Sequence, residues 1–377
     1  MDAPLRILHL PDVIGGHPPA LAKGEQGNGA VAQTLCYDPS PYGYSADIML
    51  GGAGKSFRRK LWERWRAFLQ VRNQFDVFHF NFGASLLHAP RLGAILPEMN
   101  FYRREAARFM TFQGDDARLT YPPELDESLA EERRRGRWKG GDVTHETYVD
   151  QLRLAKRRLT IRRAARLCDH MFSLNPDLLS HLPAHKSSFL PYAIEPPVVP
   201  GLAPPDLLRP AGKPLRLVHL STAPAIKGSG LIEKAVADAA RHCNVTLDLV
   251  IQQPREAALR RLAAADYMID QLVLGWYGGT VVEAMYLGVP AIGRICPDQA
   301  ARVPELSREL PLIRTDTTSL TEVIIALANA PERRPGLVER GLAFANKWHH
   351  PMEVAKLTLA AYTEALSKRR GEKPSRG

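Results

Sequence analysis

Residues 270–292 read DQLVLGWYGGTVVEAMYLGVPAI, and this stretch decides the fold. The pattern predicts a short strand, a glycine-rich loop, a helix that begins at Thr280 and a second strand from Ala291. Gly288, which is followed by a valine and a proline, ends the helix after two turns. A strand, a loop, a helix and a strand in this order are typical of α/β proteins.

The loop of this stretch is rich in glycine, with Gly275, Gly278 and Gly279 close together. A glycine backbone can turn sharply and approach another molecule closely because no Cβ intervenes. The helix that begins at Thr280 also presents unpaired N–H groups and the positive end of its dipole, which favour an anion such as phosphate. The alternative is a capping box, in which Thr280 and Glu283 satisfy each other's backbone donors. These residues alone do not decide between the two interpretations.

The length and composition of the chain predict a soluble protein with two domains. A chain of 377 residues is too long for one ordinary hydrophobic core. It is 45% hydrophobic and 24% charged, and it holds no apolar run near the length of a membrane span. The N-terminus lacks the apolar core of a secretory signal, and the four cysteines are scattered without a metal-binding spacing. We therefore expect a cytoplasmic protein with reduced thiols.

The charge of the chain indicates an anionic partner. The formal net charge is +10 and the sequence pI is about 9.5. Nucleic acid, an anionic membrane surface and a phosphorylated substrate all fit this charge. Because the basic residues are spread out, without interleaved aromatic residues or a recognisable nucleic-acid module, we expect no nucleic-acid partner.

Apolar runs alternate with helical patterns on both sides of a proline-rich segment. This alternation predicts an α/β fold with two Rossmann-like domains and a cleft between them. The N-terminal domain is expected over residues 1–195, the proline-rich linker over 196–214 and the C-terminal domain over 215–350. The helix and basic tail of residues 351–377 are expected to pack back toward the N-terminal domain.

Two loops of the first half follow apolar runs that we interpret as strands. Gly15 and Gly16 follow the run at residues 5–10, and Gln113 and Asp115 follow a later run. Residues at the carboxyl ends of such strands lie where open α/β sheets bind ligands. The pattern G-x-G-x-x-G is missing from the sequence, which disfavours a dinucleotide site.

Two charged segments of the first half are interpreted as surface. Residues 124–141 are dense in charge and turn formers, and we expect an exposed insertion there. Residues 151–167 predict a helix with seven basic residues and no acidic residue. Because its apolar residues fall on opposite sides, a domain helix with a basic outer surface is favoured over a membrane-surface helix.

Several motifs of the second half resemble the donor site of a known enzyme family. They lie at residues 219–228, 264–266, 270–271, 275–279 and 282–285. Together they resemble the C-terminal donor site of GT-B glycosyltransferases. Within this class, the motifs look like those of the large retaining family, which includes glycogen and sucrose synthases and many bacterial polysaccharide and lipopolysaccharide transferases. Weaker matches in the first half lie at residues 15–16, 111–115 and 174–178.

The resemblance implies a GT-B fold, with an acceptor-side N-terminal domain and a nucleotide-sugar donor domain after it. It implies an enzyme that moves a sugar from a UDP- or GDP-linked donor to an acceptor, with retention and without a metal or other cofactor. The implied acceptor is a saccharide, a lipid-linked molecule or a small molecule, in the synthesis of cell-surface polysaccharide, glycolipid or natural-product glycoside. An anionic or lipid-linked acceptor would make this a peripheral protein at the inner face of the membrane.

The resemblance also implies roles for individual residues. Lys227 is expected to stabilise the leaving diphosphate, and Glu283 to accept hydrogen bonds from the ribose hydroxyls. Gln113 and Asp115 are expected to contact the donor sugar or the acceptor, and with Lys227 they form the expected catalytic set. The expected donor-binding set is Gly15, Gly16, Lys227, Gly228, Gly275, Trp276, Tyr277, Gly278, Gly279, Thr280 and Glu283.

The sequence departs from the family pattern at three positions. The family often carries two glutamates, and this chain has Gly275 at the position of the first. Where the family usually has a basic residue the chain has Pro224, and where the family often has a histidine it has Gln113. Two alternatives therefore stay open. One is a nucleotide-sugar epimerase with the same architecture, and the other is a non-catalytic protein that binds sugar nucleotides or uses its basic surface.

Overall fold

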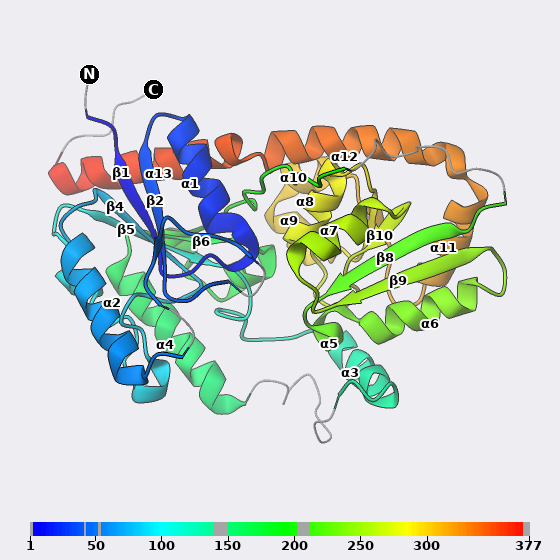
Figure 1. The fold of residues 1–377 in the computed structure, drawn as a ribbon, viewed down its shortest axis with the longest axis horizontal. Helices are drawn as coiled ribbons and strands as arrows, with labels where there is room; N and C mark the ends of the chain where they lie inside the picture. The colour runs from blue at the N-terminus through cyan, green and yellow to red at the C-terminus, as the bar shows by residue number, and fades with distance from the viewer. Residues whose placement is uncertain (1–2, 41–42, 52–53, 139–149, 202–211, 372–377) are drawn as a thin grey trace. The chain divides into compact units, whose positions relative to one another are not determined.

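The chain forms two compact units. The computed structural model describes residues 3–40, 43–51, 54–138, 150–201 and 212–371 (Figure 1). Parts of the expected linker and of the expected basic tail lie outside these described residues. The first unit comprises Met1–Leu119, Gln151–Glu195 and His349–Gly377, and the second unit comprises Thr120–Asp150 and Pro196–Trp348. In the described ranges, each helix is too short or too polar to cross a bilayer.

The first unit is built on a parallel sheet whose described strands follow the order β3-β2-β1-β4-β5-β6-β7. The strand order reverses between β1 and β4, and open α/β sheets bind ligands at such a reversal, outside the carboxyl ends of the strands. The strands are β1 (Arg6–Leu10), β2 (Val31–Cys36), β3 (Ile48–Met49), β4 (Val77–Asn81), β5 (Ala107–Phe112), β6 (His170–Ser173) and β7 (Ser187–Phe189).

Helices cover both faces of this sheet. They are α1 (His17–Gly27), α2 (Phe57–Val71), α4 (Gln151–Leu167) and α13 (Pro351–Arg370), with short 3₁₀ helices η1 (Ile14–Gly16), η2 (Pro90–Leu92), η3 (Met99–Phe101), η4 (Pro176–Ser180) and η5 (Ala184–Lys186). Figure 1 shows α2 and α4 on one side of the sheet and α1 and α13 on the other. Successive residues of β4 point to opposite faces, so that Val77 joins the core under α1 and α13 while Phe78 joins the core under α2 and α4. Burial on both faces explains why the strands read as continuous apolar runs.

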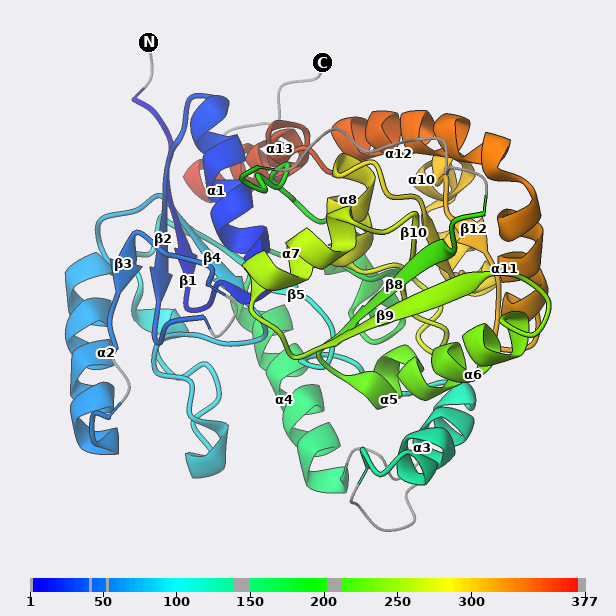
Figure 2. The same cartoon turned by 45° about the vertical axis from the view of Figure 1, so that its right-hand side comes forward.

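The second unit is built on a parallel sheet whose described strands follow the order β12-β11-β10-β8-β9, so the order reverses between β8 and β10. The strands are β8 (Leu215–Ser221), β9 (Val245–Ile251), β10 (Tyr267–Ile269), β11 (Ala291–Gly293) and β12 (Ile313–Arg314). The helices are α3 (Glu124–Arg134), α5 (Pro224–Lys227), α6 (Ser229–Ala239), α7 (Arg255–Ala263), α8 (Gly279–Tyr286), α9 (Pro297–Arg302), α10 (Pro304–Glu309), α11 (Leu320–Asn329), η6 (Pro331–Arg333) and α12 (Arg334–Trp348). Ile232 of α6 and Ile324 of α11 share one core with the sheet, and Figure 2 shows α7 and α8 on the opposite side of β8 and β9.

The loop, helix and second strand expected for residues 270–292 are confirmed, but the first strand, β10, already ends at Ile269, just before this stretch. A loop after β10 leads into α8, and β11 begins at Ala291. Helix α8 begins at Gly279, one residue before the expected start at Thr280. Gly288 has a φ of 71°, in the left-handed region that glycine adopts readily, and this lets the chain leave the helix.

Residues 124–134 form helix α3, and the expectation of an exposed insertion is wrong for them. Leu125 and Leu129 lie four residues apart on one face of this helix, and both are buried. Helix α3 belongs to the second unit, whereas the expected boundary placed it in a domain of residues 1–195. Residues 139–149, the rest of the expected insertion, lie outside the described residues.

Helix α4 spans the expected residues, and its interpretation as a domain helix is confirmed. Leu154 and Ile161 are buried, while Leu152 and Leu159 are exposed on the outer side with most of the arginines.

The C-terminal helix α13 belongs to the first unit and packs against α1. A Cβ on Gly24 would lie 2.1 Å from the carbonyl oxygen of Pro351, so this close approach depends on glycine. Thr358 and Tyr362 of α13 each donate a hydrogen bond of 3.0 Å to the buried carboxylate of Glu25 in α1. The chain therefore returns to its first unit after completing the second.

A buried histidine makes the stability of the first unit depend on pH. Burial lowers the pKa of His349 to about 4, and its Nδ1 lies 2.8 Å from the carbonyl oxygen of Tyr192. An unfolded histidine has a pKa of about 6.5, so unfolding takes up a proton between about pH 6.5 and pH 4, and stability falls as the pH falls through this window. In the variant His349→Asn, the free energy of unfolding should fall less steeply as the pH falls through this window, by up to about 1.4 kcal/mol per pH unit. Denaturant unfolding of both proteins at pH 7 and pH 5 measures the difference, and parallel pH profiles would contradict the prediction.

Candidate functional site

The reversal of strand order in the second sheet brings two of the expected motifs together. The segment of residues 222–228, here called the Lys227 loop, follows β8 and includes the short helix α5, which ends at Lys227. The glycine loop follows β10, which is the neighbour of β8 (Figure 2). Because the strands are parallel, both loops leave the same carboxyl edge of the sheet. The expected phosphate-binding residues of the second half therefore share one site.

A buried carboxylate joins the two loops. Asp270 directly follows β10, and its side chain is almost completely buried. Its Oδ1 lies 3.0 Å from the Nζ of Lys227, and its Oδ2 accepts a hydrogen bond of 2.9 Å from the backbone N–H of Gly278. Asp270 thus fixes the ammonium of Lys227 beside the N-terminus of α8, while the Lys227 side chain remains partly exposed.

Glu283 pairs with an arginine and does not form the capping box. The N-cap of α8 is Gly278, which places Thr280 inside the helix, and the helix start has no side-chain cap. The Oε1 of Glu283 instead accepts hydrogen bonds from the Nη2 and Nε of Arg255, at 2.6 and 3.0 Å. Burial raises the pKa of Glu283, and the positive charges of Arg255 and Lys227 oppose that rise.

The backbone donors at the start of α8 are divided between the protein and its surroundings. Gly278 belongs to the expected donor-binding set, but its N–H is already bonded to Asp270. The N–H groups of Gly279 and Thr280 have no acceptor among the described residues. A Cβ on Gly278 would meet only the Asp270 carboxylate, at 3.9 Å, so the loop is open at this point. The site therefore offers two fixed N–H donors next to Lys227.

The backbone at Gly275 excludes the carboxylate that the family often carries there. Its φ of 70° is left-handed, and a Cβ would lie 2.2 Å from the Sγ of Cys296. The N–H of Cys296 also donates a hydrogen bond of 2.8 Å to the carbonyl of Gly275. In this structure, Gly275 therefore allows the loop to turn and to pack closely against Cys296.

The aromatic pair of the loop faces the interior. Trp276 and Tyr277 are each only 1% exposed, and their ring centroids are 5.1 Å apart. Tyr277 also packs edge-on against Phe344 of α12. Side-chain contact of Trp276 or Tyr277 with a donor, which the expected donor-binding set includes, is therefore excluded in this conformation, and only their main chain could face a ligand.

Helix α3 supports the Lys227 loop from outside. The Ser128 hydroxyl donates a hydrogen bond of 2.6 Å to the carbonyl of Ala225, and the Glu132 carboxylate accepts one of 2.7 Å from the N–H of Gly230 in the first turn of α6. Gly228, between α5 and α6, has a φ of 79° and makes the turn that separates these helices. The loop that carries Lys227 is therefore held on both sides.

The glycines expected at the first-domain site lie at the carboxyl end of β1. Gly15 and Gly16 both have left-handed backbones, with φ of 66° and 71°. A Cβ on Gly16 would collide with the ring of Tyr44 at 2.4 Å, whereas a Cβ on Gly15 would meet nothing within 4 Å. Gly15 is therefore the glycine of this pair whose backbone is open to approach.

The loop after β5 holds Gln113 and Asp115 in different ways. Gln113 is half-buried, and its carbonyl accepts a hydrogen bond from the Asn175 amide. Asp115 is exposed and pairs with Arg118 at 2.9 Å. The carboxylate that shapes the loop is Asp116, which accepts the N–H groups of Gln113 and its neighbour, and burial raises its pKa to about 6.

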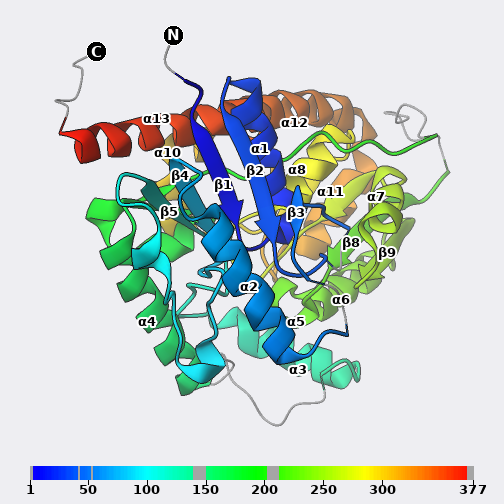
Figure 3. The same ribbon diagram turned by 60° about the vertical axis from the view of Figure 1, so that its left-hand side comes forward.

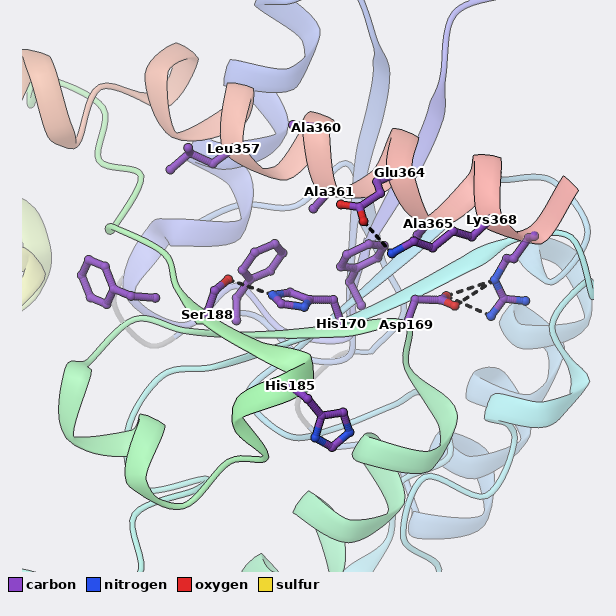
Figure 4. Close-up of a pocket in the computed structure, with 14 residues that line it drawn as sticks. Asp169, His170, His185, Ser188, Leu357, Ala360, Ala361, Glu364, Ala365 and Lys368 are labelled. Atoms are coloured by element: carbon purple, nitrogen blue, oxygen red, sulfur yellow. Dashed lines mark hydrogen bonds and ion pairs between the residues drawn. The ribbon is translucent and has the colours of Figure 1, made fainter. Parts of the chain in front are cut away.

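A cavity of about 670 Å³ lies elsewhere in the first unit, between β6, β7 and α13 (Figure 4). His170 Nε2 and Ser188 Oγ are 2.8 Å apart there, but the nearby Glu364 bonds to Lys368. Among the described residues, none of the expected site residues lines this cavity. The sheet residues that line the cavity lie within β5, β6 and β7, on the face that α13 covers, and not in the loops after these strands, where open α/β sheets bind ligands.

Asp270, which lies in one of the motifs that carry the resemblance, and Arg255 are the site residues to which the sequence analysis gave no role. Asp270 carries a usable signal, because it is a carboxylate directly after a buried strand and just before the glycine loop. Arg255 carries no local signal, since it meets Glu283 from the first turn of helix α7, 28 positions away in the sequence.

Neither a protein-family model nor a curated protein sequence matches this chain. Solved structures match it over nearly its whole length. HepE from Anabaena, solved with UDP-glucose, has a TM-score of 0.59 at 10% identity and covers 95% of this chain and 99% of its own. The catalytic domain of starch synthase IV from Arabidopsis thaliana, bound to ADP and acarbose, has a TM-score of 0.58 at 14% identity and covers 97% and 100%. Sucrose-phosphate synthase from Thermosynechococcus elongatus has a TM-score of 0.57 at 12% identity and covers 97% and 100%.

These matches show that the chain has the two-domain α/β fold of GT-B glycosyltransferases. The expected fold class is thereby confirmed.

Proposed function

We propose that this chain is a glycosyltransferase that moves a sugar from a nucleotide-sugar donor to an acceptor. The observation that carries the proposal is the position of Lys227, held by the buried Asp270 beside the N-terminus of α8 at the strand reversal of the second sheet. A cation and backbone donors converge there, as binding of a diphosphate requires. The fold supports the same function but serves more than one activity, so the site carries the argument.

The chemistry of the transfer explains why such a site is needed. The bond between the anomeric carbon of the sugar and a diphosphate oxygen breaks, and its electron pair leaves with the diphosphate. Groups that stabilise the growing negative charge lower the barrier, with each 1.36 kcal/mol worth about tenfold in rate. One N–H of the Lys227 ammonium bonds Asp270, which leaves two for the phosphates. These two ammonium N–H groups and the backbone N–H groups of Gly279 and Thr280 supply the positive charge that stabilises the leaving diphosphate. We therefore propose transfer without a metal.

We include retention at the anomeric carbon in this proposal. The acceptor hydroxyl then attacks from the face that the diphosphate leaves, a new bond forms between its oxygen and the anomeric carbon, and its proton passes to the departing phosphate. This route requires no separate catalytic base. Gly15, Gly16, Gln113 and Asp115 lie at the carboxyl edge of the first sheet, and we assign them to contacts with the donor sugar or the acceptor.

Glu283 is assigned to the ribose of the donor. Its Oε1 is bonded to Arg255, while its Oε2 has no hydrogen-bond partner among the described residues and can accept from a ribose hydroxyl. We expect Glu283→Gln to weaken nucleoside diphosphate binding by roughly tenfold, because a hydrogen bond to a charged group contributes about 1.5–3 kcal/mol. Inorganic pyrophosphate, which has no ribose, should bind both proteins equally in calorimetry. Equal weakening for both ligands would instead assign Glu283 to a structural role, and the exposed Glu256→Gln in α7 is the matched control.

The activity is tested by following nucleotide sugars with the full chain. UDP-linked donors come first, because HepE was solved with UDP-glucose, and GDP-linked donors follow. We expect release of the nucleoside diphosphate that depends on an acceptor from a panel of saccharides, lipid-linked sugars and small glycosides. Conversion of the donor without any acceptor would indicate an epimerase, and recovery of every donor unchanged would contradict catalysis.

A further inference from the structure

Helix α2 exposes an apolar stripe on its outer side. Five large apolar side chains of this helix are exposed by 39–59%: Phe57, Leu61, Trp62, Trp65 and Leu69. Leu61, Trp65 and Leu69 follow one another at four-residue spacing, with Trp62 beside them, so they form one face. Figure 3 shows α2 along the outside of the first unit. A surface helix of a globular protein ordinarily turns such residues inward.

This stripe borders the face by which α2 is attached, and the ring of Trp65 lies 5.6 Å from that of the buried Phe68. Ala67, Phe68 and Val71 are buried, and the Phe68 ring packs edge-on against Tyr102 at 5.1 Å. Arg64 lies over the ring of Tyr37, at 3.8 Å from its centroid. Buried residues beside the stripe therefore attach the helix to the first unit, while Trp62 and Trp65 remain 57% and 47% exposed.

The outer face is also strongly basic. The helix contains five basic residues and one acidic residue, Glu63, which is turned toward Lys55 at 2.9 Å. Arg58 and Arg66 are exposed beside the apolar stripe, and neither has a carboxylate partner among the described residues. Arg66 lies 5.6 Å from the ring centroid of Trp62. Tryptophan, leucine and unpaired arginine thus alternate on one surface.

We propose that this face of α2 docks the first unit on an anionic lipid bilayer. Indole and leucine side chains can enter the boundary between headgroups and acyl chains, while long arginine side chains reach back to lipid phosphates. A protein partner would have to bury unpaired guanidinium groups, which is costly. If two copies of the chain packed together through α2, the arginines of one helix would face those of the other, and their like charges would repel. This inference does not depend on the proposed sugar transfer.

Co-sedimentation of the full chain with vesicles tests the proposal. Phosphatidylcholine vesicles that contain phosphatidylglycerol should bind the protein, pure phosphatidylcholine vesicles should bind it at least tenfold more weakly, and salt should reduce the binding. Trp62→Ser/Trp65→Ser and Arg58→Gln/Arg66→Gln should each lower the partition coefficient by tenfold or more. The matched control is Leu152→Ser/Leu159→Ser, which alters exposed leucines of the still more basic α4 and should change little.

A blue shift of tryptophan emission on vesicle addition, lost in the tryptophan variant, is a second readout. The proposal is overturned if anionic vesicles are not bound, or if the α2 and α4 variants bind alike. It is also overturned if light scattering shows that the α2 substitutions dissolve a dimer, or if they abolish binding of a single-stranded oligonucleotide while leaving vesicle binding intact.

Discussion

Replacing Lys227 by alanine is expected to weaken the binding of the donor nucleoside diphosphate by tenfold or more. The ammonium is held 3.0 Å from Asp270 and retains two donors for phosphate oxygens. Charge-assisted hydrogen bonds of this kind are about twice as strong as neutral ones, so a loss of at least 1.4 kcal/mol is expected. Isothermal titration calorimetry with the nucleoside diphosphate measures it directly.

The control for this substitution concerns Asp270. Lys227→Ala leaves the buried carboxylate without its cation, and breaking a buried pair in this way costs about 3–5 kcal/mol of stability. The double variant Lys227→Ala/Asp270→Asn removes the unpaired charge and keeps an acceptor for the Gly278 N–H, so it should be more stable and bind as weakly. Lys234→Ala, on the exposed side of α6, is the matched lysine control. If the double variant binds the nucleoside diphosphate with wild-type affinity, Lys227 does not contact the phosphates.

Gly275→Glu is expected to destabilise the second unit by about 2–5 kcal/mol and to leave nucleotide affinity no better. The substitution introduces the carboxylate that many family members have, but in this chain it meets a left-handed backbone and the Sγ of Cys296 at 2.2 Å. A left-handed backbone costs about 1–2 kcal/mol for a residue with a Cβ, and overpacking adds about 1–3 kcal/mol. Thermal and denaturant unfolding report the loss.

Gly278→Ala is the contrasting substitution in the same loop. Its φ of −96° suits any residue, and a Cβ would lie 3.9 Å from Asp270. Its effect on stability should stay below about 1 kcal/mol, while the added methyl group should hinder the approach of a diphosphate. If Gly275→Glu unfolds no more readily than Gly278→Ala, the constraint described for Gly275 is wrong.

The sequence predicted the elements of the fold that depend on local patterns. Continuous apolar runs mark β1, β8 and β10 because these strands are buried on both faces, and Gly288 marks the end of α8 because only a left-handed residue fits there. The resemblance added the GT-B fold, which the matching structures confirm. No elements were predicted between residues 293 and 350, where α9 to α12 lie.

The parts of the site that escaped prediction depend on distant contacts. Thr280 and Glu283 have the spacing of a capping box. However, Arg255 reaches Glu283 from the start of helix α7, and α8 begins one residue before Thr280. Trp276 and Tyr277 belong to a glycine-rich loop, where exposed side chains are expected, but both are buried, and Tyr277 packs against Phe344 of helix α12. The dense charge of α3 is typical of an exposed insertion, but the distant ion pair of Glu124 with Arg294 and the buried Leu125 and Leu129 hold this helix in the second unit.

The most direct test of the central claim is calorimetric titration of the wild-type chain with UDP, GDP, ADP and CDP. We predict that at least one of them binds with a Kd below about 1 mM, the range in which enzymes usually hold their substrates. The same ligand should bind at least tenfold more weakly to Lys227→Ala/Asp270→Asn. If none of the four binds the wild-type protein, Lys227, Asp270 and the glycine loop do not form a donor diphosphate site.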